Sequence, residues 1–115
     1  MSSAPAGAML AHSVYFTLEN AGAEARETLA AACRQLLSRH PGTVFFAVGT
    51  RAKDIAWSVS DLDFDVVLHL VFRSKADHDR YQDSPEHGRF LEENQSNWKT
   101  IRVFDAEVQP GDTRP

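Results

Sequence analysis

The stretch from Tyr81 to Asp105 holds the residues of this chain that are best suited to chemistry. Ser84 followed by Pro85 is typical of a helix start, because Ser caps free backbone N–H groups and Pro lacks only an N–H that would be unpaired there. His87 then falls in the first turn, on the side of the helix that carries apolar residues. An imidazole that faces an apolar interior needs a polar partner, and we expect it to find Tyr81 or Asp105.

Tyr81, His87 and Asp105 together would suit the abstraction of a proton beside a carbonyl group. An Asp that accepts a hydrogen bond from one imidazole nitrogen fixes the tautomer and leaves the other nitrogen free to take a proton. A nearby Tyr hydroxyl can donate to the developing enolate oxygen. The structural alternative is that His87 and Asp105 form a buried pair that pins a helix to the last strand. The sequence leaves both interpretations open.

The remaining histidines do not suggest a metal site. His12 and His69 are expected on opposite faces of the sheet, so they cannot join His87 in one ligand set, and no carboxylate spacing completes a site. His40 and His78 are expected at the surface. We therefore predict no metal and no cofactor.

Composition narrows the class of protein. The net charge is -4 at pH 7 and Lys and Arg do not cluster, so we expect no nucleic-acid partner. No run approaches the roughly 20 apolar residues of a membrane span, and we expect no membrane partner. Cys33 is the single cysteine and cannot form an intrachain disulfide, which fits a cytoplasmic protein.

Hydrophobic periodicity predicts one domain of alternating strands and helices. Val14, in a first strand with alternating apolar residues, shares a face with His12. We expect strands at 12–18, 43–49, 64–72 and 100–108, helices at 23–39, from Ser74 and from Pro85, and a loop at 51–63. Residues 1–8 are predicted to be a disordered tail, 9–108 the domain, and 109–115 a flexible tail.

This order predicts an α+β ferredoxin-like β-α-β-β-α-β subunit, with helices on one side of a four-stranded antiparallel sheet. The other face would be bare and would carry a mixed set of residues: Tyr15, Asp65, Val67, His69, Val71, Arg102 and Phe104. A second copy of the same sheet, related by a two-fold axis, is the simplest cover for such a face. We therefore predict a homodimer through the open sheet face.

The sequence resembles the stress-responsive A/B barrel (Dabb) family over roughly Met9 to Val108. The resemblance is carried by His-x-Val-x-Phe from His12, the helix stop at His40-Pro41-Gly42, Val48-Gly49, Phe64-Asp65-Val66-Val67-Leu68, Tyr81, Pro85-Glu86-His87 and Val103-Phe104-Asp105. It implies a ferredoxin-like subunit that forms a dimeric α/β barrel. It implies less about activity.

One characterised activity of that family is the cofactor-free aldol cyclisation of a polyketide, and the resemblance implies a catalytic role for Tyr81, His87 and Asp105. It also implies a pocket for a small apolar molecule, lined by His12, Val14, Leu29, Cys33, Val66, Phe90, Trp98, Ile101 and Val103. Val66 stands where the cyclase has a histidine, and Leu29 and Cys33 stand where it has aromatic residues. Two hypotheses follow: a homodimeric binding protein of unassigned activity, or a cofactor-independent cyclase, lyase or monooxygenase.

Overall fold

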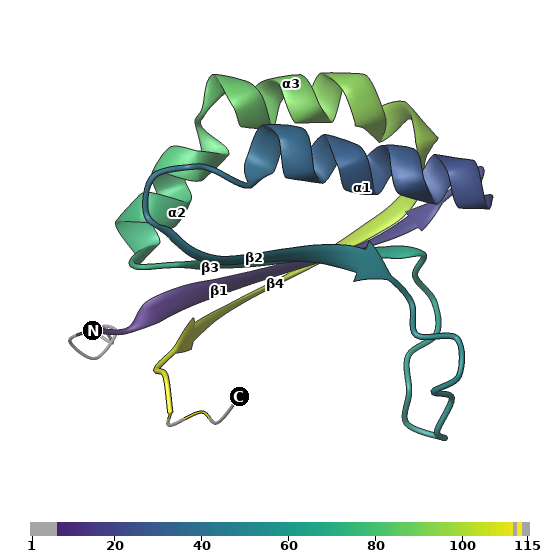
Figure 1. Cartoon of the computed structure of the whole chain (residues 1–115), viewed down its shortest axis with the longest axis horizontal. Helices are drawn as coiled ribbons and strands as arrows, with labels where there is room; N and C mark the ends of the chain where they lie inside the picture. Colours follow the sequence, from purple (N-terminus) through teal and green to yellow (C-terminus); the bar gives the residue numbers. More distant parts are fainter. Residues whose placement is uncertain (1–6, 112, 114–115) are drawn as a thin grey trace.

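The computed structural model describes residues 7–111 and 113. Its elements follow the predicted order and are β1 (Met9–Leu18), α1 (Ala23–Leu37), β2 (Thr43–Thr50), β3 (Val66–Phe72), α2 (Lys75–Gln82), α3 (Pro85–Asn94), a 3-10 turn (Gln95–Asn97) and β4 (Trp98–Val108). The strands form one antiparallel sheet in the order β2-β3-β1-β4. The helices lie on one side of this sheet, which is the predicted ferredoxin-like arrangement (Figure 1).

The element boundaries differ from the predicted ones by a few residues. β1 begins at Met9 and β4 at Trp98, both earlier than predicted, because the two strands pair along their whole length from Met9 opposite Val108. α1 ends at Leu37, where the Ser38 hydroxyl donates to the Arg34 carbonyl oxygen at 2.5 Å. The predicted N-terminal tail falls largely on residues 1–6, which lie outside the described part of the chain, as do 112, 114 and 115 of the C-terminal tail.

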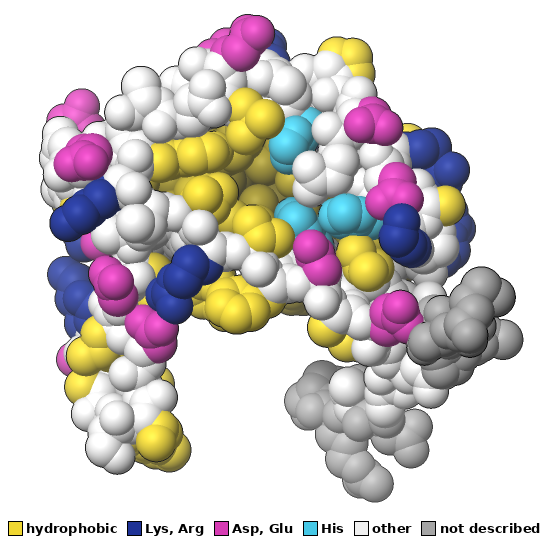
Figure 2. Space-filling model, turned by 180° about the vertical axis from the view of Figure 1, so that it is seen from behind, with side chains coloured by type: hydrophobic (Ala, Val, Ile, Leu, Met, Phe, Trp, Pro, Cys, Tyr) yellow, Lys and Arg dark blue, Asp and Glu magenta, His cyan; other side chains and the backbone are white. Residues whose placement is uncertain are grey.

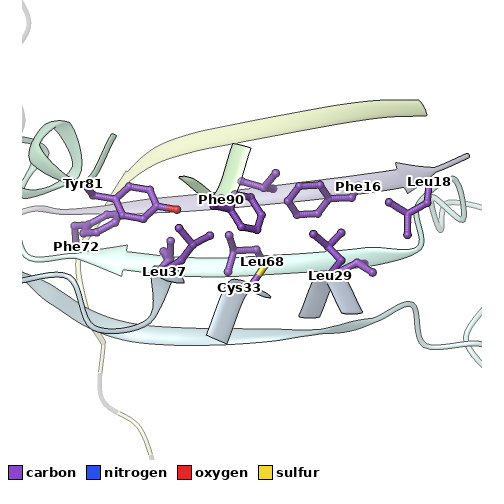
Figure 3. Close-up of a cluster of buried hydrophobic side chains, with 12 residues drawn as sticks. Phe16, Leu18, Leu29, Cys33, Leu37, Leu68, Phe72, Tyr81 and Phe90 are labelled. Atoms are coloured by element: carbon purple, nitrogen blue, oxygen red, sulfur yellow. The ribbon is translucent and has the colours of Figure 1, made fainter. Parts of the chain in front are cut away.

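The hydrophobic core lies between the helices and the inner face of the sheet (Figure 3). Alternate residues of β1 and β3 supply the sheet side of the core, as their period-two pattern requires. α1 supplies Leu29, Cys33 and Leu37 from one stripe, and α3 supplies Phe90. These four side chains are at most 4% exposed.

A tight contact fixes the start of α2. Gly42 has a φ of +90°, and a Cβ at this position would collide with the side chain of Asp77. Asp77 is itself buried, and its backbone N–H donates to the capping hydroxyl of Ser74 at 3.2 Å. The glycine of the predicted helix stop therefore also makes room for the helix that carries His78 and Tyr81.

The sheet face away from the helices carries the predicted mixture of residues. Cross-strand pairing puts Tyr15 beside Val67 and Arg102, and Ser13 beside His69 and Phe104. The loop between β2 and β3 extends beyond the sheet on this side (Figure 1). It is fastened to the open face by Arg102, whose guanidinium donates to Asp61 at 2.6 Å.

Apolar side chains are exposed on both the open face and the loop. Phe45 and Phe104 are 54% and 55% exposed, and Trp57 and Val59 at the loop are 75% and 86% exposed. The described part of the chain contains no helix that is long and apolar enough to cross a bilayer.

Candidate functional site

A cavity of about 460 Å³ opens between the inner sheet face and the helices α2 and α3. Its apolar wall comes from the strands and α3, and its polar residues gather at one end. Seen from behind the view of Figure 1, the hollow has a hydrophobic floor with histidine side chains along one edge (Figure 2). The polar residues that line it are His12, His78, Tyr81, Gln82, His87 and Asp105. A drug-sized ligand site has about this volume and this division of polar and apolar groups.

Asp105 pairs with His12, so the predicted pairing of Asp105 with His87 is wrong. His12 and Asp105 lie directly opposite each other on β1 and β4, with side chains on the same face of the sheet. His12 Nδ1 and Asp105 Oδ1 are 2.5 Å apart. Because an ionised carboxylate can only accept, Nδ1 carries the proton and Nε2 keeps its lone pair. The pair therefore fixes the tautomer of His12.

His78 also lies at the polar end of the cavity, although the sequence had placed it at the surface. Its side chain is 15% exposed, and its Nε2 is 3.9 Å from Asp105 Oδ1. His78 Nδ1 lies 3.1 Å from Asp79 Oδ1, so its N–H donates a hydrogen bond to this carboxylate. His78 Nε2, which then keeps its lone pair, is also 3.5 Å from the amide nitrogen of Gln82.

His87 and Tyr81 complete the polar end. The Ser84 hydroxyl accepts from the backbone N–H of His87 at 3.2 Å, which confirms the predicted cap and fixes the first turn of α3. The His87 ring packs edge-on against Tyr81, with centroids 5.0 Å apart. Tyr81 is 2% exposed, and its hydroxyl points along the core toward the region of Phe90 (Figure 3).

Burial holds these groups in their neutral forms. It lowers the pKa of His12, against the opposing hydrogen bond and charge of Asp105. Burial also lowers the pKa of His87, and the neighbouring His12 and His78 lower it further. The pKa of the Tyr81 phenol is raised, again by burial. Neutral imidazoles can accept a proton or a metal ion, and a protonated phenol can donate a hydrogen bond.

The structure brings most of the predicted site residues to this cavity. Those on its wall are His12, Val14, Tyr81, His87, Phe90, Trp98, Ile101, Val103 and Asp105. Leu29, Cys33 and Val66 lie in the hydrophobic core instead, outside the lining of this cavity. Burial raises the pKa of the Cys33 thiol to about 12, which makes this residue an inert part of the packing.

His78 and Gln82 are the polar residues that sequence reasoning missed. The spacing of α2 does indicate this, because positions 78 and 82 lie on the same helical face as Tyr81. If Tyr81 faces inward, His78, which lies about one turn earlier on the same side of the helix, must face inward as well. The pairing of His12 with Asp105 could likewise be read from an antiparallel alignment of the first and last strands.

Comparisons with known proteins place this geometry in a family. The family model described as the stress responsive A/B barrel domain matches residues 10–108. No curated protein matches the sequence significantly.

Solved structures agree with this match. A Dabb family protein with a ferredoxin-like fold from Mesorhizobium loti is 22% identical, with a TM-score of 0.74, and the match covers 90% of this chain and 99% of the other. A hydroxynitrile lyase from Passiflora edulis is 20% identical, with a TM-score of 0.72 over 95% and 99% of the two chains. A dimeric ferredoxin-like protein of unknown function from Jannaschia is 25% identical, with a TM-score of 0.70 over 87% and 99%.

Proposed function

Because this chain belongs to the stress responsive A/B barrel domain family, we propose that it is a homodimeric protein whose cavity binds a small molecule with an apolar body and a carbonyl group. The observation that carries the proposal is the cavity of about 460 Å³ with polar groups at one end only. Such a division selects a ligand that is itself polar at one end.

The chemistry of the two ends defines the ligand class. Phe90, Trp98 and Val103 offer an apolar surface without charge, which suits an aromatic or aliphatic body. The Tyr81 hydroxyl, which points from the polar residues toward the region of Phe90 (Figure 3), is a donor, and a carbonyl oxygen is its natural acceptor. A strongly anionic ligand is disfavoured because Asp105 stands at the polar end and its side chain is 44% exposed.

The homodimer is supported by the open sheet face. Tyr15, Phe45 and Phe104 would otherwise leave a large apolar surface in water. The relative from Jannaschia is described as dimeric. Size-exclusion chromatography with light scattering should give twice the mass of the chain at micromolar concentration. A charged substitution on this face, Phe104→Glu, should shift the protein to monomer, and a wild-type protein that is monomeric throughout would refute the dimer.

Ligand binding can be tested with acetophenone, an aromatic ketone of suitable size. We expect saturable binding in ligand-observed NMR, measured in EDTA so that metal ions play no part. Val103→Phe should obstruct the mouth of the cavity and weaken binding at least about 10-fold, because the ligand would lose part of its apolar contact surface. Val44→Phe makes the same change at an exposed position of β2 outside the cavity lining, so it is the matched control and should bind normally. Equal binding by both variants would place the ligand elsewhere.

A second candidate function is acid–base catalysis on such a ligand, favoured by the 2.5 Å contact of His12 with Asp105. His12 Nε2, with its lone pair fixed by the bond at Nδ1, would take a proton from the carbon beside the carbonyl. The Tyr81 hydroxyl would donate to the enolate oxygen. His87, with its lowered pKa, is the alternative base. No oxidant or cofactor is required for this step.

Hydrogen–deuterium exchange at the methyl group of acetophenone in D2O measures this proton transfer directly. His12→Gln should slow the catalysed exchange by a factor of about 100 or more, the usual contribution of a general base. His87→Gln tests the other imidazole, and His69→Gln on the open face is the control. If wild-type protein exchanges the methyl protons no faster than buffer, the catalytic hypothesis fails while the binding proposal stands on its own test.

A further inference from the structure

We propose that His12, His78 and Asp105 form a binding site for a divalent transition-metal ion, with Zn²⁺ as the best fit. The three residues come from β1, α2 and β4, and each offers one ligand atom. These atoms all lie within 4.8 Å of one another. The site goes beyond the proposed function and does not depend on it, because it requires no organic ligand.

The distances fit an ion after small side-chain movements. Two ligand atoms about 2.1 Å from a shared tetrahedral Zn²⁺ stand about 3.4 Å apart. Asp105 Oδ1 is now 2.5 Å from His12 Nδ1 and 3.9 Å from His78 Nε2, so the observed distances lie on either side of that value. The ion would replace the hydrogen bond between His12 and Asp105. His12 would then bind the ion through Nδ1 as the other neutral tautomer, with the ring proton on Nε2. The Asp105 side chain is 44% exposed, so the carboxylate would rotate toward solvent to open that contact.

Asp79 supplies the outer contact that metal-binding histidines usually have. The Nδ1–H of His78 donates a hydrogen bond to Asp79 Oδ1 at 3.1 Å. The lone pair of Nε2, on the side of Asp105, can then bind the ion. A carboxylate behind a ligating imidazole fixes the tautomer and the ring orientation and increases the basicity of the ligand. The adjacent Asp79 thus gives His78 the carboxylate–histidine arrangement of a zinc ligand.

The ligand types favour a transition-metal ion of intermediate hardness over the hard cations Ca²⁺ and Mg²⁺. Two imidazoles and one carboxylate suit Zn²⁺, Co²⁺ or Ni²⁺, whereas the hard cations prefer oxygen ligands. Three protein ligands leave one tetrahedral position open, as in catalytic zinc sites. Because the same three residues line the cavity, that position faces the space where a carbonyl oxygen would bind. An ion there would polarise the carbonyl group.

The test measures metal binding by the full, tag-free chain after treatment with chelator and dialysis. Isothermal titration with Zn²⁺ should give one ion per chain, and Co²⁺ should produce visible d–d absorption of a tetrahedral site. His78→Gln should weaken Zn²⁺ binding at least about 100-fold, and Asp79→Asn about 10-fold, in keeping with the loss of a ligand and of an outer contact. Asp105→Asn should also weaken it.

His40→Gln is the matched control, because it removes a half-buried imidazole outside the ligand set. It should bind Zn²⁺ like the wild type. The proposal is overturned if the wild type binds no Zn²⁺, or if His78→Gln and His40→Gln bind it equally well. Circular dichroism of each variant checks the fold, and because His78→Gln and Asp105→Asn alter partly exposed side chains, they should remain folded. Acetophenone binding in EDTA is unaffected by either outcome.

Discussion

The helix-covered face of the sheet is filled in one half and hollow in the other. In the filled half, Leu29, Cys33, Val66 and Leu70 are at most 4% exposed, and none of them lines the cavity with the histidines. In the hollow half, above β4, Ile101 and Val103 are 42% and 48% exposed, and polar side chains replace apolar ones. One half holds the fold together, and the other is arranged around a space. The hollow half is therefore where function should lie.

The largest expected effect is in the filled half. Leu70 is 1% exposed, and Leu70→Ala should lower the free energy of unfolding by about 2–5 kcal/mol, because it removes apolar contacts and leaves a cavity. Urea denaturation measures the change. Its counterpart in the hollow half, Val103→Ala, should cost less than about 1 kcal/mol. Similar losses in both variants would show that the two halves are equally packed.

The filled half was also the easier one to predict from sequence. Alternation along β1 and β3 fixes which side chains face the helices, and the stripe on α1 fixes which residues meet them. The hollow half depends on how α2 and α3 are rotated, and α2 has no strong apolar stripe to fix its rotation. α2 is the clearest case, since Asp77 and Tyr81 are its buried residues, and one of them is charged.

Most members of the candidate site were predicted, but their pairing was not. His12, Tyr81, His87 and Asp105 do meet at one cavity. Asp105 nevertheless pairs with His12 because cross-strand neighbours are fixed by register, whereas His87 reaches the site from the first turn of α3. Periodicity gives the face of a side chain but not its partner. His78 was missed for a different reason: its polar type suggested the surface, although the spacing of α2 puts it on the face of Tyr81.

The second prediction concerns the contact that positions α2 over the hollow half. Gly42→Ala should lower the free energy of unfolding by about 1–3 kcal/mol, because φ is +90° and the new Cβ would collide with Asp77. Gly88→Ala in α3 is the control, since nothing lies within 4 Å of its Cβ position. It should raise stability by about 0.5–1 kcal/mol, the usual helix preference for Ala over Gly. If Gly42→Ala left the free energy of unfolding unchanged, α2 would have to be able to move away from the new Cβ.

The third prediction uses the pH dependence of the hollow half. Burial and the nearby His12 and His78 lower the pKa of His87, so the unfolded chain takes up this proton before the folded protein does. Stability should therefore fall as the pH drops from about 7 through the ordinary histidine pKa of about 6.5, until the lowered pKa is passed.

His87→Gln should reduce this dependence, which urea denaturation at several pH values in EDTA measures. Tyr81 packs against the His87 ring, and its phenol does not titrate in this range because burial raises its pKa. His40→Gln, which removes an imidazole outside the cavity lining, is again the comparison variant. An unchanged slope in His87→Gln would mean that His87 is solvated in the folded protein, contrary to its place on the cavity wall.

The smallest expected change in stability comes from filling the hollow half. Val103 is 48% exposed at the mouth of the cavity, so Val103→Phe adds apolar surface where there is room for it. The free energy of unfolding should stay within about 0.5 kcal/mol of the wild type, as is usual for partly exposed positions. The same variant is the one expected to lose acetophenone. Together these results would show that the space contributes to binding and not to folding. If Val103→Phe instead raised the free energy of unfolding by more than about 1 kcal/mol, the cavity would be a packing defect that the added ring repairs. Its polar residues would then serve only to bind a metal ion or to take up a proton, without an organic ligand.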